Sequence, residues 1–215
     1  MPALRQPVQD RSRRTLEALL EATEALLADR RFEEISVAEI VLKAGASTGS
    51  FYARFASKEA LLPALYARYH AELPQRLRRI AATVDLPRLS LAEACRRVVR
   101  EFAATFEGRL NLMRAIVLYA RTRTDELQPL MAERAAVHGQ LIDMFRPFHN
   151  AIRHPDPEAA IRAGLFLVGT TVREAVLFPD APMAALTRLP LDRLEHMLAD
   201  ILHAYLATPP EGDTA

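Results

Sequence analysis

The chain has 215 residues, of which 50% are hydrophobic and 26% are charged, and its formal net charge is +1. This is the composition of an ordinary folded protein with one or two domains, and it excludes a largely disordered chain. A single cysteine, Cys95, excludes an internal disulfide and a cysteine-rich metal site, as expected in a reducing cytoplasm. No signal peptide is recognisable, and the longest strongly apolar stretch, 163–172, is too short to span a bilayer. We therefore expect a cytoplasmic protein without a membrane segment.

The first predicted element is a helix from about Arg11 to Arg30. Its apolar residues recur at helical spacing and form one stripe of Leu16, Leu19, Leu20, Thr23 and Leu27. Arg13 and Arg14 stand with Arg11 near the start of this helix, where a neighbouring nucleic acid would offer phosphate partners. The alternative is that these arginines form a solvated charged face, which is the commoner role of such a run.

The next segment, SVAEIVLKAGASTGSFYARFASKEAL, starts with a well-marked short helix. Ser36 and Glu39 form a capping box, in which each side chain satisfies a backbone N–H at the start of a helix. The helix should therefore begin at Val37. Gly45 stands where a helix end needs a residue that tolerates positive φ, so we expect the helix to stop near Ala44.

A second short helix is predicted over residues 48–52, with Ser47 as its N-cap. Phe51 and Phe55, four positions apart, provide its buried face. The pair Ser57-Lys58 predicts the cap and the first residue of a third helix. Two short helices joined by a tight turn are the arrangement by which a protein presents a helix to DNA.

The side chains left outside this unit predict a DNA-contacting surface. Residues 48–50 are small and would let the backbone approach base edges. Tyr52 and Arg54 are placed to reach phosphate oxygens. The Lys58 ammonium, together with the N–H groups at the start of the third helix, is expected to clamp a phosphate.

Gly45-Ala46-Ser47-Thr48-Gly49 also matches the G-x-S-x-G nucleophile elbow of serine hydrolases. That elbow requires a buried strand before the serine, whereas the residues before Gly45 are capped and helically periodic. We find no run rich in β-branched residues at strand length that is followed by a turn signal. A hydrolase is therefore rejected.

Other enzyme classes find no support either, and we predict no cofactor and no metal site. No glutamate is followed by a histidine three residues later, as a di-iron bundle would require. His196 and His203 could share a helix face, but no carboxylate or third histidine completes a metal set. The glycine patterns of nucleotide-binding loops are absent from the sequence.

Residues 11–66, with GASTGSFYARFASKEAL as the specific core, resemble the DNA-binding domain of the TetR family of bacterial transcriptional regulators. The resemblance implies that Ser36 and Tyr52 contact phosphate, that the 47–50 segment faces the major groove and that Lys58 holds the DNA backbone. Many members carry a lysine where this chain has Thr48, so binding should depend more on Arg54 and the N-terminal arginines. The full set of predicted DNA-contacting residues is Ser36, Ser47, Thr48, Gly49, Ser50, Tyr52, Arg54, Lys58, Arg13 and Arg14.

The rest of the chain also predicts helices. In the helix from Lys58, Pro63 is close enough to the start to be tolerated, while Pro74 is expected to bend or end the helix. Ser90 and Glu93 form a second capping box. The further helices are expected over residues 91–107, 110–119, 125–148, 157–178 and 191–205.

The family resemblance implies that the middle helices surround a pocket for a small-molecule effector. A run of Met and Phe at helical spacing more often fills a core than binds a ligand, so only part of the set is expected to line a cavity. The candidate effector-pocket residues are Phe102, Phe106, Met113, Val117, His138, Leu141, Phe145 and Phe166.

Two apolar stripes in the final third of the chain predict a dimer interface. Small residues on the first stripe would let another helix come close, and two-fold pairing suits a helix-turn-helix protein that reads two half-sites. The alternative is that both stripes face the chain's own core. The predicted interface residues are Ile161, Gly164, Leu165, Val168, Val172, Leu194, Leu198, Ile201 and Tyr205.

The sequence thus predicts an all-α protein. Residues 1–57 would form an N-terminal three-helix helix-turn-helix DNA-binding domain, and residues 58–215 a larger C-terminal helical domain for ligand binding and dimerisation. The predicted partners are double-stranded DNA with a near-palindromic operator, an unidentified small-molecule effector and a second copy of the chain. The expected function is that of a repressor released from its operator by a small, largely apolar ligand. The alternative is an all-helical ligand-binding or oligomeric scaffold that does not use DNA.

Overall fold

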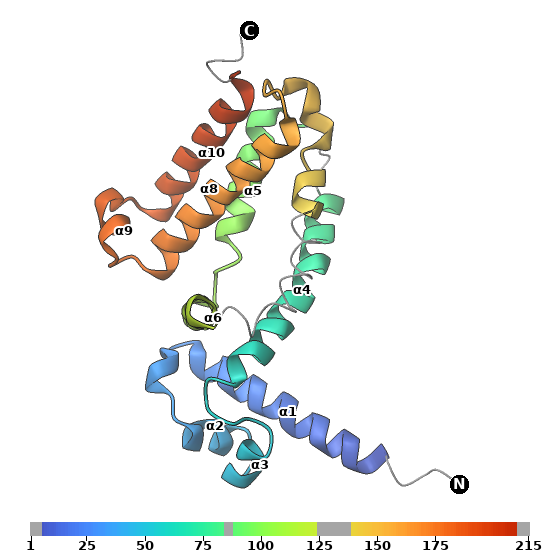
Figure 1. Ribbon diagram of the computed structural model, residues 1–215, viewed down its shortest axis with the longest axis vertical. Helices are drawn as coiled ribbons and strands as arrows, with labels where there is room; N and C mark the ends of the chain where they lie inside the picture. Colours follow the sequence, from blue (N-terminus) through green and yellow to red (C-terminus); the bar gives the residue numbers. More distant parts are fainter. Residues whose placement is uncertain (1–5, 84–87, 124–138, 210–215) are drawn as a thin grey trace. The chain divides into compact units, whose positions relative to one another are not determined.

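The computed structural model describes residues 6–83, 88–123 and 139–209, in which every regular element is a helix (Figure 1). The all-α prediction is therefore confirmed. The described residues form two compact units: 6–71 with 108–123, and 72–83 with 88–107 and 139–209. The domain boundary expected between residues 57 and 58 stays a prediction. None of the described helices is long and apolar enough to cross a bilayer.

The first unit begins with α1 (Gln6–Leu27), the 3-10 helix η1 (Phe32–Glu34), α2 (Val37–Lys43) and α3 (Thr48–Tyr52). α1 starts earlier than the predicted Arg11 and ends before Arg30. Its predicted stripe is buried except for Leu16, which is half-buried. Thr23 lies inside this core, where its hydroxyl donates to the carbonyl oxygen of Leu19 at 2.7 Å and so remains hydrogen-bonded.

α4 (Leu61–Thr83) differs from its prediction at both ends. It begins at Leu61 rather than Lys58, because residues 56–60 form bends and turns. The N–H of Leu61 donates to the carbonyl of Lys58 at 3.1 Å, a three-residue turn that precedes the α-helix. Pro63 lies in the first turn, where its missing N–H breaks no helical bond. The helix then runs through position 74, where we expected it to bend or end, and continues to Thr83.

α6 (Leu110–Thr122) completes the first unit. It follows Gly108, whose φ of +68° suits glycine, and it extends beyond the predicted end at residue 119. The side-chain amide of Asn111 donates to the carbonyl of Leu27 at 3.0 Å. This bond satisfies a carbonyl at the end of α1 that has no partner within the helix.

In the second unit, α5 (Leu91–Ala103), α8 (Pro157–Leu177) and α10 (Leu191–Ala207) pack side by side (Figure 1). The predicted Ser90–Glu93 capping box is confirmed, and α5 ends at Ala103 rather than near residue 107. α8 begins as expected, with Asp156 as its N-cap. A short helix that the sequence reading placed in a loop, α9 (Pro182–Thr187), has Pro182 in its first turn.

The helix predicted over 125–148 lies partly outside the described residues. Its described part is α-helical only to residue 143, and η3 (Arg146–Ala151), a 3-10 helix, follows. Pro147 stands at the start of η3 and has no N–H to continue the α-helical ladder, so the prediction of a helix reaching residue 148 is wrong.

The two stripes predicted as a dimer interface mostly face the chain's own core. Ile161, Val168 and Val172 of α8 are at most 2% exposed, and Leu194 and Leu198 of α10 are buried with them. Gly164 is buried too, and a Cβ at this position would collide with the side chain of Leu202. Leu165 is half-buried. The glycine brings α8 and α10 together within one chain, so this part of the interface prediction is wrong.

Other apolar side chains of the same two helices are exposed. Ile201 and Tyr205, which were predicted at an interface, are 51% and 37% exposed. Phe166 is 68% exposed and Leu167 is 53% exposed. Phe166 therefore does not line a pocket in this chain, contrary to its prediction.

Cys95 is fully buried in α5. Burial raises the pKa of its thiol to about 12 because the interior disfavours the thiolate. The thiol therefore stays protonated and unreactive at neutral pH.

Candidate nucleic-acid interface

α2 has the caps that its sequence predicts. The hydroxyl of Ser36 accepts from the N–H of Glu39 at 3.2 Å, and the Glu39 carboxylate accepts from the N–H of Ser36 at 2.8 Å. At the other end Gly45 has a φ of +60°. The N–H of Ala46 then donates to the carbonyl of Val41 at 2.9 Å and closes the turn.

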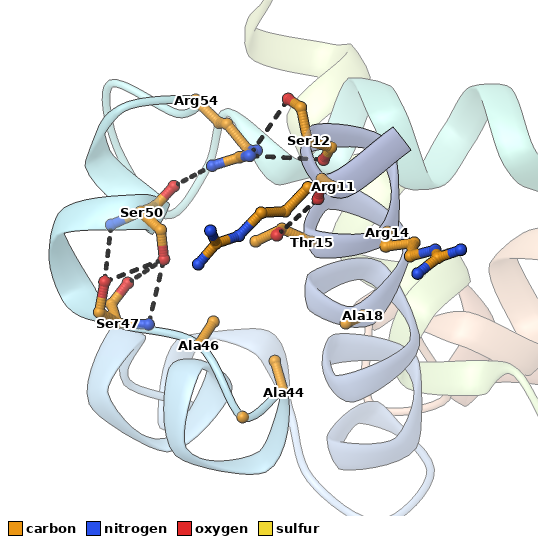
Figure 2. A pocket seen from close by; sticks show the side chains of 11 residues that line it. Arg11, Ser12, Arg14, Thr15, Ala18, Ala44, Ala46, Ser47, Ser50 and Arg54 are labelled. Atoms are coloured by element: carbon orange, nitrogen blue, oxygen red, sulfur yellow. Dashed lines mark hydrogen bonds between the residues drawn. The ribbon is translucent and has the colours of Figure 1, made fainter. Parts of the chain in front are cut away.

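α3 is held at its start by a reciprocal serine pair (Figure 2). The hydroxyl of Ser47 accepts from the N–H of Ser50 at 3.1 Å, and the hydroxyl of Ser50 accepts from the N–H of Ser47 at 3.0 Å. The Ser50 hydroxyl also donates to the carbonyl of Ser47 at 2.7 Å. Ser47 was predicted as the cap, but the part played by Ser50 was missed because serine replaces the usual Glu or Gln of a capping box.

The exposed surface of α3 is consequently narrower than predicted. Thr48 and Gly49 are exposed and make no side-chain hydrogen bond that closes the cap. Ser47 and Ser50 were expected to face bases, but their hydroxyls are engaged with each other and with the backbone. Thr48 and Gly49 therefore remain the most accessible positions of the segment.

Tyr52 combines an anchored ring with an exposed surface. Its ring packs edge-on against that of Phe51, with the ring centroids 5.3 Å apart, and the residue is 55% exposed. Phe51 is fully buried and also contacts Phe55. The buried phenylalanines fix the Tyr52 ring, and the tyrosine is presented to a partner without much loss of side-chain entropy.

A groove of about 700 Å³ lies between the start of α1 and the turn that joins α2 to α3 (Figure 2). In Figure 2 the Arg11 guanidinium extends into the space beside the serine pair, whereas Arg14 points away from it. Arg13 is exposed on the same helix but does not line the groove. The groove-lining residues are Arg11, Ser12, Arg14, Thr15, Ala18, Ala44, Gly45, Ala46, Ser47, Ser50 and Arg54.

Arg54 connects α3 to α1 across the groove. Its guanidinium donates to the carbonyl of Ser50 at 2.7 Å and to the hydroxyl of Ser12 at 3.2 Å. The side chain is half-buried. We expected Arg54 to reach a phosphate, but here it holds the two helices together. Nothing in the local sequence indicates a partner that lies 42 positions away.

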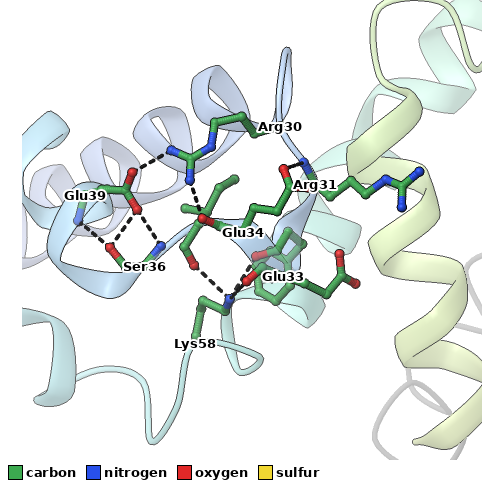
Figure 3. A network of polar contacts seen from close by, with 9 residues as sticks. Arg30, Arg31, Glu33, Glu34, Ser36, Glu39 and Lys58 are labelled. Carbon is green, nitrogen blue, oxygen red and sulfur yellow. Dashed lines mark hydrogen bonds and ion pairs between the residues drawn. The ribbon is translucent and has the colours of Figure 1, made fainter.

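Lys58 also has partners within the chain (Figure 3). Its ammonium donates to the carbonyls of Phe32 and Ile35, each at 2.8 Å, and lies 3.5 Å from the carbonyl of Glu33. It lies 4.6 Å from the centroid of the Phe32 ring. The free ammonium at a helix start that we expected is therefore not present, and we do not carry the phosphate clamp forward.

Glu39 joins the cap of α2 to a second cation (Figure 3). Its carboxylate pairs with the Arg30 guanidinium at 2.5 Å. Hydrogen bonds from Arg30, and then from Ser36, lower the pKa of Glu39 to about 2. The carboxylate is therefore charged wherever the protein is folded at neutral or mildly acidic pH.

The hydrolase alternative is inconsistent with this geometry, because the helix α2, rather than a strand, precedes Gly45. The effector-pocket prediction stays open for most of its residues. Phe106, Met113 and Phe145 are buried, and Phe102, Val117 and Leu141 are half-buried. His138 lies outside the described residues.

Comparison with known proteins places the capped segment in a described family. Residues 19–65 match the family profile described as bacterial regulatory proteins, tetR family. No curated protein sequence matches the chain.

Solved structures of similar fold carry the same family description. A TetR-family transcriptional regulator from Streptomyces coelicolor matches with a TM-score of 0.60 and 22% identity, covering 88% of this chain and 81% of that chain. The TetR-family regulator PfmR from Thermus thermophilus matches with a TM-score of 0.55 and 21% identity over 86% of this chain and 96% of its own. FadR from Bacillus subtilis, solved with stearoyl-CoA, gives a TM-score of 0.52 and 17% identity over 88% and 98% of the two chains. At these identities the likeness concerns the fold.

Proposed function

We propose that this chain, whose N-terminal domain is that of the TetR family of bacterial transcriptional regulators, regulates transcription by sequence-specific DNA binding. The observation that carries the proposal is the recognition segment, residues 36–54, in which α2, the Gly45 turn and α3 are capped at each junction. A rigid helix with a small, exposed surface suits entry into a major groove.

Within the recognition segment, each exposed group suits a different part of the duplex. Thr48 and Gly49 are small and accessible, so they would lie against base edges. Tyr52 would donate its hydroxyl to a phosphate, which positions the protein but carries no sequence information. Arg11, Arg13 and Arg14, all exposed near the start of α1, would contribute further phosphate contacts. Ser36, Ser47 and Ser50 would act mainly through the caps that they form.

We propose a homodimer that pairs through the exposed apolar surface of α8 and α10. A Cβ at Gly164 would lie 3.7 Å from the Tyr205 ring, so these two positions adjoin. Leu167 is one turn beyond Gly164, and Ile201 one turn before Tyr205, which extends the same patch along both helices. Burying such exposed apolar side chains against a second copy would stabilise a two-fold dimer.

We further propose that the regulator is a repressor released by a small, largely apolar ligand. The support is the apolar set in the second unit, where Phe106 and Phe145 are buried and Phe102 and Leu141 half-buried. Because FadR was solved with stearoyl-CoA, acyl-CoA compounds are sensible first ligands to test. A ligand would release DNA by binding more tightly to a dimer state whose recognition helices do not fit the operator.

The test is selection of the full chain against random duplex DNA, followed by titration at several salt concentrations. A near-palindromic site should emerge, and its affinity should fall steeply with salt. Addition of the ligand should release the site. A chain that enriches no sequence would instead be the alternative, an all-helical scaffold that does not use DNA.

Two variants then test the residue roles on the selected site. Tyr52→Phe should weaken binding by roughly the same factor on all sequences and lower the salt slope little, because a neutral phosphate contact is lost. Thr48→Ala should change the preference at one base position in each half-site. Tyr119→Phe in α6, which loses the same hydroxyl outside the recognition segment, is the control. If both test variants bind like the parent, these assignments are wrong.

A further inference from the structure

The connection between α1 and α2 carries four successive backbone carbonyls, at residues 32–35, whose partners are unusual. η1 is only three residues long, so a helical ladder cannot satisfy the carbonyls at its end. Phe32 and Ile35 are nevertheless buried, at 5% and 1% exposure. Carbonyl groups next to buried side chains require partners, and here the partners come from distant side chains.

One cation satisfies three of these carbonyls. The Lys58 ammonium donates to the carbonyls of Phe32 and Ile35 at 2.8 Å and has the Glu33 carbonyl at 3.5 Å. An ammonium has three N–H groups and no acceptor, so this arrangement leaves no donor for another partner. The Phe32 ring below it adds a cation–π contact.

A second cation takes the remaining carbonyl. The Arg30 guanidinium donates to the carbonyl of Glu34 and also pairs with the Glu39 carboxylate, which caps α2 (Figure 3). Residues 32–35 are therefore held from both sides, by the end of α1 and by the loop before α4. The residue that follows them is Ser36, the N-cap of α2.

We propose that Lys58 is a positioning residue for DNA binding. Together with Arg30 it forms a carbonyl clasp, defined as these two side chains and the carbonyls of residues 32–35, and the clasp fixes the start of α2 and with it the whole recognition segment. This inference rests on the proposed function, because it concerns how that function is supported. It replaces a direct phosphate contact by Lys58 with an indirect role through the backbone.

Lys43 offers a matched control, because the chain has only two lysines. Lys43 is exposed in the last turn of α2 and takes no part in the clasp. Lys43→Met and Lys58→Met remove the same charge from the same domain. Lys58→Arg keeps a cation that can still donate to carbonyls.

The experiment measures DNA affinity against salt concentration, and thermal unfolding, for the parent and these three variants in the full chain. Lys58→Met should bind the selected duplex about tenfold more weakly, with the salt slope of the Lys43→Met control, and should unfold about 5 °C lower. Lys58→Arg should recover most of the affinity. Lys43→Met should keep the parent's unfolding temperature.

Each other outcome overturns the proposal in a recognisable way. A salt slope lower by about one than that of Lys43→Met, with unchanged unfolding temperature, would assign Lys58 to a phosphate. A lower unfolding temperature with unchanged affinity well below it would make Lys58 a stabilising residue only. A parent chain that selects no DNA would refute the proposed function itself, which the variants do not affect.

Reductive methylation gives a readout without DNA. Lys58 should be modified far more slowly than Lys43 in the folded chain and equally fast after unfolding, because its ammonium lies on the carbonyls. Equal rates in the folded chain would contradict the clasp.

Discussion

At the scale of single residues, Glu39 links the cap of α2 to the carbonyl clasp. It accepts from the N–H of Ser36 and pairs with Arg30, whose guanidinium also reaches the carbonyl of Glu34. Protonation of this one carboxylate would weaken both arrangements. The acid response of the recognition segment should therefore depend on Glu39.

The direction of this response follows from the pKa. Glu39 has a folded-state pKa of about 2, below its ordinary value of 4.5, so its contribution to stability is present above pH 4.5 and is lost as the pH falls towards 2. We expect Glu39→Gln to unfold at a lower temperature than the parent at pH 7, with the difference narrowing from pH 5 to pH 2.

Thermal unfolding at several pH values measures the narrowing. Glu33→Gln makes the same change on an exposed residue of η1 outside the capping box, and it should stay close to the parent at every pH. A difference between parent and Glu39→Gln that is constant down to pH 2 would contradict the assigned role.

At the scale of helices, what the sequence predicted depended on how far apart the interacting residues lie. The caps at Ser36, Ser47 and Ser90 were predictable because the box closes within three residues. The partners of Arg54 and Lys58 were not, because they lie 42 and more than 20 positions away and a single sequence carries no record of such pairs. The exposed cations were therefore assigned to DNA by default.

The same limit explains the error on α8. Apolar periodicity identified one face of the helix correctly, but periodicity cannot tell whether that face meets the chain's own α5 and α10 or a second copy. Gly164 and Gly169 were read as low spots for a partner. They are instead the places where Leu202 and Phe102 of the same chain approach α8.

Gly169 gives the second prediction at this scale. A Cβ at this position would lie 2.7 Å from Cζ of Phe102, too close for a rigid ring to adapt without moving as a whole. Overpacking costs about 1–3 kcal/mol, against a gain of about 1 kcal/mol from replacing a helical glycine by alanine. We therefore expect Gly169→Ala to lower the free energy of unfolding by about 1 kcal/mol.

A double-mutant cycle identifies the ring as the cause. In a Phe102→Leu background the tip of the ring is gone, so Gly169→Ala should become neutral or stabilising when measured by denaturant unfolding. An equal loss in both backgrounds would mean that Phe102 is not what excludes a side chain from position 169.

At the scale of the whole molecule, the exposed apolar residues of α8 and α10 are consistent with the proposed dimer. Side chains as large as Phe166, at 68% exposure, and Ile201, at 51%, are costly to leave in water when they gather in one patch. We expect Phe166→Glu to give a folded protein that sediments as a monomer at concentrations where the parent is a dimer, because a charge would be buried at the interface.

Leu42→Glu is the control, because Leu42 is 82% exposed on α2 and lies in the other unit. It should leave the sedimentation behaviour unchanged. Loss of the dimer should also abolish preference for paired half-sites in the DNA selection. A Phe166→Glu protein that remains dimeric would place the interface elsewhere.

The buried thiol of Cys95 makes the chain well suited to site-specific labelling. Since that thiol stays protonated inside α5, a cysteine introduced at the exposed position of Leu42 would be the only reactive one in each copy. A spin label attached there would mark each recognition segment once. Pulsed measurements of the distance between the two labels could then follow how the spacing of the segments changes as a ligand is added.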